Sequence, residues 1–211
     1  MLTFQVLSTL LRYPVPELNA ELAAAEQILR REAILPLAHL EAVSAYLAGL
    51  KVTPQLEAES AYIDAFDKGR STSLHLFEHI HGDNRARGEA LHRLLLRYRA
   101  HGLELASREL PDFLPLFLEF LSTRPLAEAR KHMAEVTDIA ALIGRRLRAR
   151  SAPHAPLLEA IAALAPPGVS ADQQLDEVPP RDDTPGALDA AWEEAPVTFN
   201  DAAIAQTAPH S

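Results

Sequence analysis

His75 and His79 stand four positions apart with Glu78 between them, and their spacing suits metal chemistry better than any other in the chain. On a helix this spacing places two imidazoles on one face, where both can ligate a zinc ion. The run 75–79 also matches the His-x-x-Glu-His pattern of the inverted zinc proteases. No Glu-rich metal motif follows downstream, so a structural or solvent-facing role is favoured. A metal-dependent hydrolase that uses these three residues is the alternative.

Five carboxylates are candidates for acid–base catalysis: Asp64, Asp67, Glu109, Asp112 and Glu119. A paired-carboxylate mechanism needs two carboxyl groups about 5 to 10 Å apart, and sequence spacing does not establish such a distance. The chain also lacks a glycine-rich phosphate loop, a G-x-S-x-G motif and a dinucleotide-binding fingerprint. By elimination we predict a binding or scaffolding module that is not an enzyme and uses neither a metal nor a cofactor.

The 211 residues carry a formal net charge of −9, and most of it lies near the end of the chain. From residue 171 onward there are nine acidic residues and a single basic one, Arg181, so the remainder is nearly neutral. Nucleic-acid binding needs a basic face. The basic stretch 85–99 also has few aromatic residues on which bases could stack. We therefore expect no nucleic-acid partner.

The chain has no cysteine, which excludes disulfides and thiolate metal sites and fits a reducing compartment. Its first residues lack the basic region and the small-residue cleavage site of a signal peptide. No apolar run approaches the roughly 20 residues that a membrane-spanning helix needs. We expect a soluble, cytoplasmic protein that does not insert into the membrane.

Apolar residues recur at helical spacing along most of the chain, and no segment is typical of paired strands. In the stretch 36–47, Leu37, Leu40, Val43 and Leu47 form the predicted buried stripe. Proline, glycine and polar breaks separate the periodic stretches. Helices are predicted over residues 2–12, 16–31, 36–47, 54–66, 71–81, 85–101, 113–121, 126–150 and 154–165. The predicted fold is all-α, a single helical domain of about eight helices.

Residues 109–121 contain a proline–aspartate pair followed by an almost wholly apolar run. We predict that Asp112 is the N-cap of a helix, because its carboxylate can accept a bond from an early backbone N–H and suits the positive helix end. Pro115 then lies in the first turn, where a missing N–H costs nothing. Phe113, Phe117 and Phe120 crowd this short helix, which must be covered on most sides. They form either core alone or a core with a groove that takes a guest.

The composition changes at Pro166, and seven of the 16 prolines and most of the acidic excess lie from this residue onward. We predict a helical domain over residues 1–165 and a mostly disordered, acidic, proline-rich tail over 166–211. The piece 188–199 differs from the rest of the tail because it contains Trp192, Val197 and Phe199. It could dock on the helical domain, and a free tail is the alternative.

Five blocks of sequence follow one another in a specific order. They are Tyr62-Ile63-Asp64-Ala65-Phe66-Asp67, Leu74-His75-Leu76-Phe77-Glu78-His79, Gly82-Asp83-Asn84-Arg85-Ala86-Arg87-Gly88, Glu109-Leu110-Pro111-Asp112-Phe113-Leu114-Pro115 and Trp192-Glu193-Glu194-Ala195-Pro196-Val197-Thr198-Phe199. In this order and spacing they resemble the nitrate reductase molybdenum cofactor assembly chaperones, the NarJ type within the TorD and DmsD family of redox-enzyme maturation chaperones.

The resemblance implies an all-helical chaperone that binds the N-terminal segment of the apo nitrate reductase catalytic (alpha) subunit. Binding would allow molybdenum cofactor insertion before membrane attachment, and the chaperone would not be part of the mature enzyme. It would act as a monomer or weak dimer. The hinge motif of the broader family is usually Pro-Asp-His. Here Phe113 replaces that histidine, so no role of the histidine is carried over.

A chaperone of this kind would hold its client as an amphipathic helix in an apolar groove. Aromatic and leucine side chains would line the groove, carboxylates would meet basic residues of the client, and Asp112 would fix where the wall begins. The client-binding residues expected on this basis are Tyr62, Asp64, Phe66, Asp67, Asp112, Phe113, Leu114, Phe117, Leu118 and Glu119. Plain core packing is the alternative for each aromatic residue.

Overall fold

The computed structural model describes residues 1–81, 85–105, 109–166 and 184–192, and every regular element within these ranges is helical. The elements are α1 (Leu2–Leu10), α2 (Leu18–Glu32), α3 (Leu37–Val52), α4 (Gln55–Phe66), the 3-10 turn η1 (Arg70–Thr72), α5 (Glu78–His81), α6 (Arg85–Ala100), α7 (Leu114–Ser122), α8 (Leu126–Ala134), α9 (Thr137–Ala149), α10 (Ala155–Ala162) and α11 (Pro185–Trp192). The predicted all-α fold class is confirmed.

Proline marks the start of three of these helices. Pro36, Pro54 and Pro125 each occupy the N-cap of the helix that follows. Proline is well tolerated at a helix start, because the first N–H groups of a helix have no partner within it. These three boundaries therefore lie close to where the sequence predicts them.

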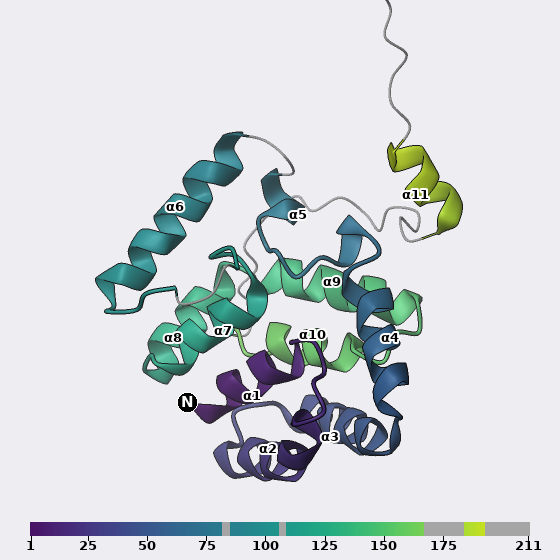
Figure 1. Cartoon of the computed structure of the whole chain (residues 1–211). Coiled ribbons are helices and arrows are strands. Elements are labelled where there is room, and N and C mark those ends of the chain that lie inside the picture. The colour runs from purple at the N-terminus through teal and green to yellow at the C-terminus, as the bar shows by residue number, and fades with distance from the viewer. Residues whose placement is uncertain (82–84, 106–108, 167–183, 193–211) are drawn as a thin grey trace, which may run out of the picture.

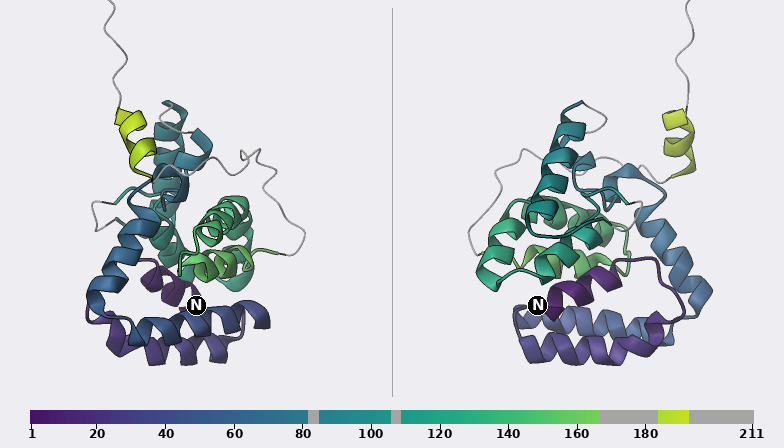
Figure 2. Two further views of the ribbon diagram at one scale, coloured as in Figure 1. Left: turned by 90° about the vertical axis from the view of Figure 1, so that its right-hand side faces the viewer. Right: turned by 60° about the vertical axis from the view of Figure 1, so that its left-hand side comes forward.

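Helix α1 lies in the middle of the described helices, with α7 and α10 on one side and α2 on the other (Figure 1). Helices α2 and α3 pack side by side as one layer, and α9 and α10 pack together as another. Two further views keep the α2–α3 layer on the same side of α1 (Figure 2). Helix α6 extends along the edge of the molecule (Figure 1).

The core is centred on the contact between α1 and α7. Phe4 and Leu7 of α1 and Phe117 and Leu118 of α7 are all buried. The hydroxyl of Ser8 donates a hydrogen bond of 2.7 Å to the carbonyl of Pro115, which joins the two helices. Burying a side chain of this size contributes roughly 1.5 to 3 kcal/mol, so this contact is a main source of stability.

Helices α9 and α10 approach closely because residue 144 is glycine. A Cβ atom at Gly144 would meet the Cγ atom of Glu159 at 3.2 Å and the Cβ atom of Leu158 at 3.4 Å. The link between the two helices is short, and His154 at its end is the N-cap of α10. The close pairing of α9 and α10 thus fixes the backbone position of His154.

Two predicted helices are wrong. Residues 71–81 do not form one helix, since only η1 and the single turn α5 are helical there. Between them the chain bends and turns around one isolated bridge, and it pairs with the start of α7 through Leu76 N–H to Asp112 O at 3.0 Å and Leu114 N–H to Leu74 O at 2.9 Å. This long-range pairing outweighs the local helical periodicity of the segment.

The stretch 126–150 is also not a single helix, because it breaks between α8 and α9. Val136, with φ −125 and ψ 2, is the N-cap of α9, and its side chain is buried. Apolar residues keep their helical spacing across this break, so periodicity alone did not reveal it.

The predicted buried stripe of α3 is correct except at its first residue. Leu37 is 67% exposed, whereas Leu40, Val43 and Leu47 of the same stripe are buried.

Most of the predicted tail, residues 167–183 and 193–211, lies outside the described residues. Within it the structure describes α11, which covers Trp192 and the first part of the predicted docking piece 188–199. The predicted domain boundary at 165 and the docking of that piece therefore stay predictions. Among the described helices, none is both long and apolar enough to cross a membrane.

Candidate functional site

Asp112 is fully buried, but it is not the N-cap of α7, so that prediction is wrong. Helix α7 begins at Leu114 with Phe113 as its N-cap, and no side chain caps it. The Asp112 carboxylate instead accepts a 3.0 Å hydrogen bond from the backbone N–H of Phe77. It therefore joins the start of α7 to the turn before α5.

Two basic side chains complete the surroundings of this carboxylate. Nδ1 of His75 lies 3.4 Å from its Oδ1 atom, and Nη2 of Arg87 lies 4.0 Å from its Oδ2 atom. Arg87 also pairs with Glu78 at 3.0 Å. The hydrogen bond with Asp112 is the main cause that raises the pKa of His75. This Asp112 cluster ties α5, α6 and α7 together.

His75 and His79 do not share a metal-like site. His75 contacts Asp112, whereas Nε2 of His79 lies 2.8 Å from the carbonyl oxygen of Ser73. Burial lowers the pKa of His79, so its surroundings favour the neutral ring. Within the described part of the chain, no three His, Cys, Asp or Glu side chains are grouped so that they could hold a metal ion. The hydrolase alternative is therefore not favoured.

The ten residues predicted to bind a client fall into two groups. Asp64, Asp67 and Glu119 are exposed, and Phe113 is partly buried. The remaining six are buried: Tyr62, Phe66, Asp112, Leu114, Phe117 and Leu118. The apolar residues of α7 thus serve the core beneath α1, and a role for them in client binding stays a prediction.

Among the exposed carboxylates, two already have partners. Asp64 pairs with Lys68 one helical turn away, and Oε1 of Glu119 lies 2.6 Å from Nη2 of Arg12. Burial raises the pKa of Asp67. Burial also raises the pKa of Tyr62, and the charge of Asp67 raises it further.

A cavity of about 290 Å³, which we call the His154 cavity, opens between α3, α4 and the start of α10. The larger apolar and aromatic side chains in its wall are Leu10, Leu18, Tyr46, Leu50, Tyr62 and His154. The sequence predicted Tyr62 but missed Tyr46 and His154. The sequence does offer one signal for His154, because it is a polar residue directly before the apolar start of a predicted helix.

The His154 ring lies among three other rings. The distances from its centroid are 5.0 Å to the Phe66 ring, 5.7 Å to Tyr46 and 6.0 Å to Tyr62. The two predicted residues Tyr62 and Phe66 also contact each other, at 5.0 Å between centroids. Edge and tilted contacts at these distances are favourable, so they stabilise the part of the cavity wall that Tyr46, Tyr62 and His154 form.

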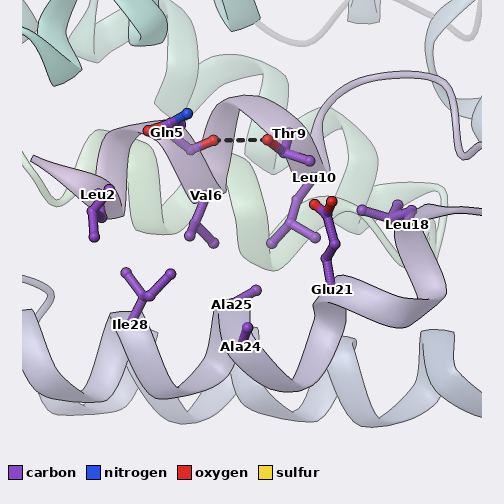
Figure 3. Close-up of a pocket in the computed structure, with 10 residues that line it drawn as sticks. All are labelled: Leu2, Gln5, Val6, Thr9, Leu10, Leu18, Glu21, Ala24, Ala25 and Ile28. Carbon is purple, nitrogen blue, oxygen red and sulfur yellow. Dashed lines mark hydrogen bonds between the residues drawn. The ribbon is translucent and has the colours of Figure 1, made fainter.

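A second opening, the α1–α2 groove, has a volume of about 250 Å³. Leu2, Val6 and Leu10 of α1 face Ile28 and Ala25 of α2 across it (Figure 3). On the α2 side the lining includes the small side chains of Ala24 and Ala25, which leave the groove open, and the carboxylate of Glu21 (Figure 3). Leu10 and Leu18 line both this groove and the His154 cavity.

Residues 16–160, which run from just before α2 almost to the end of α10, match the model of the family described as nitrate reductase delta subunit. The chain belongs to this family. The matched span contains the Asp112 cluster and all of the His154 cavity except Leu10, Arg12 and Pro14.

Several relatives within the nitrate reductase delta subunit family carry specific names. The chain is 39% identical over 201 residues to the nitrate reductase molybdenum cofactor assembly chaperone NarJ of Escherichia coli K12, which covers 94% of this chain and 85% of NarJ. It is also 39% identical to the probable assembly chaperone NarW of the same strain, over 94% of this chain and 84% of NarW. A probable NarJ of Bacillus subtilis is 32% identical over 77% of this chain and 87% of its own length.

These findings confirm the resemblance drawn from the five sequence blocks. The relatives are named as assembly chaperones and not as enzymes, which agrees with the prediction that the chain is not an enzyme. The alignment with NarJ spans 94% of the chain, so the likeness is not confined to the short motifs.

Proposed function

We propose that this chain is an assembly chaperone for a nitrate reductase and binds the N-terminal segment of the apo catalytic (alpha) subunit. Molybdenum cofactor would then be inserted in the cytoplasm before the enzyme attaches to the membrane, and the chaperone would leave. The observation that carries the proposal is membership of the delta subunit family, with NarJ as a relative of nearly full length.

The open surface that best suits an amphipathic client helix is the α1–α2 groove. It is lined mainly by leucine, valine, isoleucine and alanine, and Leu2 at its end is 49% exposed. An apolar helix face can be laid into such a groove. Burial contributes roughly 25 cal/mol per Å² of apolar surface, less the cost of ordering the client.

Charge would set the register of the client in this proposal. Asp67 is exposed and its charge raises the pKa of Tyr62, and the exposed Glu119 pairs with Arg12. Carboxylates at such positions attract basic residues of a client and raise the rate of association more than the final affinity. The buried members of the predicted set, such as Phe117 and Leu118, would support the groove from beneath.

Calorimetric titration with a peptide from the N-terminus of a nitrate reductase catalytic subunit tests this proposal. We expect saturable binding to the wild-type chain. Ala25→Phe should weaken it at least tenfold by filling the groove, whereas Ala48→Phe, an exposed alanine on α3, should not. No heat from the wild-type titration would refute the chaperone role. Equal binding by both variants would refute the location.

The cellular part of the proposal has its own measurement. In cells without this chain, nitrate reductase subunits should accumulate without molybdenum cofactor, and active reductase from wild-type cells should not contain the chain. Recovery of fully loaded reductase from the deletion strain would contradict the proposal. Light scattering across concentrations tests whether the chaperone is a monomer or weak dimer.

A further inference from the structure

Cationic side chains gather where the end of α9 meets η1. Nη1 of Arg146 donates a 2.8 Å hydrogen bond to the carbonyl of Ser71, and Arg146 is only 7% exposed. Arg150 donates to the hydroxyl groups of Ser71 and of Thr72, the latter at 3.2 Å. These bonds position two guanidinium groups beside η1, where their charge adds to that of other cations.

The described charges around η1 leave a positive excess. Asp64 pairs with Lys68, and Glu159 pairs with Arg148. Asp67, at the C-cap of α4, adds a third carboxylate. Six cationic residues belong to this end of the molecule, and we call them the η1 basic cluster: Lys68, Arg70, Arg145, Arg146, Arg148 and Arg150. Six positive charges against three negative ones leave an excess of three positive charges.

Other carboxylates near the cluster do not remove this excess. Glu78 and Asp112 lie in the neighbourhood of His79, which contacts the segment after η1, but both of them are close to Arg87. Burial lowers the pKa of His79, so its ring adds no charge near neutral pH. Asp138 lies in the first turn of α9, at the opposite end of that helix. The η1 basic cluster therefore attracts an anionic partner.

The part of the tail that the structure describes lies at the same end of the molecule. Helix α11 lies beyond the C-terminal end of α4, from which the chain continues into η1, in every view of Figures 1 and 2. Thr184 begins this part of the tail, and its hydroxyl accepts a 3.2 Å hydrogen bond from the N–H of Ala187. Asp182 and Asp183 directly precede Thr184. Two residues of chain span at most about 7 Å, so α11 brings these two carboxylates to the end of the molecule that carries the cluster.

The charge of the tail is opposite to that of the cluster. From residue 171 onward the chain carries nine acidic residues and one basic residue. A segment that is joined to its binding site by a short linker acts at an effective concentration in the millimolar range. The chain's own tail therefore has an advantage over an acidic segment of any other molecule, which must reach such a concentration in solution.

We propose that the η1 basic cluster binds the chain's own acidic tail, and that Asp182 and Asp183 are the carboxylates that bind it. Their two negative charges offset most of the positive excess. Arg70 is the exposed member of the cluster within η1 itself. The bound tail fixes α11 beside the helical domain and shields the cluster from other polyanions. This interaction is independent of the proposed chaperone function.

Distance measurements between two spin labels test the docking in the full chain. Because the chain has no cysteine, two introduced cysteines carry the labels without competition. Gly186→Cys labels α11 at a position where a Cβ atom meets nothing within 4 Å, and Ala149→Cys labels the exposed end of α9. We expect one narrow distribution of distances at low salt. At 1 M salt, where screening acts within about 3 Å, the distribution should broaden.

Two tail variants of equal charge separate a specific contact from general attraction. In the doubly labelled chain, Asp182→Asn with Asp183→Asn should broaden the distribution, whereas Asp172→Asn with Asp176→Asn should leave it narrow. A broad distribution before any tail substitution, or the same response to both variants, would overturn the inference. Loss of the narrow distribution on mixing with excess unlabelled chain would overturn it too, because the tail would then bind a second copy.

Titration with inorganic tripolyphosphate tests whether the tail shields the cluster. The Asp182→Asn, Asp183→Asn variant should bind this anion about fivefold more tightly than the wild type, which corresponds to one favourable exposed ion pair. Adding Arg70→Gln should remove the gain, whereas Arg31→Gln, at an exposed arginine of α2, should keep it. Equal affinity of the wild type and the tail variant, or a gain that survives Arg70→Gln, would overturn the inference.

Discussion

Asp112 and His154 are both buried polar side chains, but the structure treats them in opposite ways. Asp112 has a backbone donor and two basic side chains within 4.0 Å. His154 lies among three aromatic rings, and its Nδ1 atom has no hydrogen-bond partner among the described residues. Polar groups inside proteins are usually paired. Asp112 therefore holds the fold together, whereas His154 is buried without a hydrogen bond that compensates its Nδ1 atom.

The same contrast separates two histidines. The Asp112 hydrogen bond raises the pKa of His75, and burial lowers the pKa of His154. A histidine that gains a charged partner becomes a stronger base, and one that only loses water becomes a weaker base. Burial alone therefore does not tell which polar groups stabilise a fold, and their partners must be compared.

The largest effect is expected for Asp112→Ala. Removing this carboxylate leaves the Phe77 N–H and two basic groups without their partner. Breaking a buried charged contact in this way costs about 3 to 5 kcal/mol, which urea denaturation will measure. Asp112→Asn keeps an acceptor and should lose less. A loss near 1 kcal/mol, typical of an N-cap, would mean that the cluster contributes little.

The pH dependence of stability should show a smaller difference at His154. The folded-state pKa of about 4 lies below the ordinary value of 6.5, so the unfolded chain binds a proton first as the pH falls. Stability is then full above pH 6.5 and decreases towards pH 4, by about 3 kcal/mol at roughly 1.4 kcal/mol per pKa unit. His154→Phe should lack this part of the acid loss in paired urea titrations at pH 7 and pH 4.

His75 should give a change of opposite sign in the same titrations. Its pKa is raised in the folded state, so its contribution is complete below pH 6.5 and disappears as the pH rises through the folded value. The stability difference between the wild type and His75→Phe should therefore shrink between pH 6 and pH 8. An identical sign for His75 and His154 would break the comparison drawn above.

Glu119→Gln should have the smallest effect on stability. Glu119 and Arg12 are 47% and 40% exposed, respectively, and exposed ion pairs contribute about 0 to 1 kcal/mol. Thermal unfolding should shift little, and high salt should abolish the shift. The affinity for a basic client peptide should nevertheless fall several-fold at low salt. Arg12→Gln, which removes the other member of the ion pair, is the control. Unchanged affinity would remove Glu119 from the proposed client surface.

Most helices could be predicted because amphipathic spacing and proline starts are local signals. The stretch 54–66 became α4 (Gln55–Phe66), and the stretch 2–12 became α1. Residues 71–81 failed because their backbone is paired with 112–114, more than 30 residues away. The same pairing explains why Asp112 could not be recognised, since the donor of its hydrogen bond belongs to a segment that sequence alone places in a helix.

The candidate site was predicted only in part. Tyr62 and Phe66 are four positions apart on one helix, so their proximity follows from periodicity. Tyr46 and His154 reach them from α3 and from the start of α10, and no local pattern connects these elements. The client groove was predicted on α7, whose apolar residues are mostly buried in the structure, whereas the groove that we propose for the client lies between α1 and α2.

The pairing of α1 with α7 has a consequence for synthesis. A ribosome completes α1 about 100 residues before it begins α7, which at about 5 to 20 residues per second takes on the order of 5 to 20 s. During that interval the side of α1 that carries Phe4 and Leu7 has not met its final partner. Slower translation of residues 11–113 should therefore prolong the exposure of this surface and increase aggregation of the nascent chain.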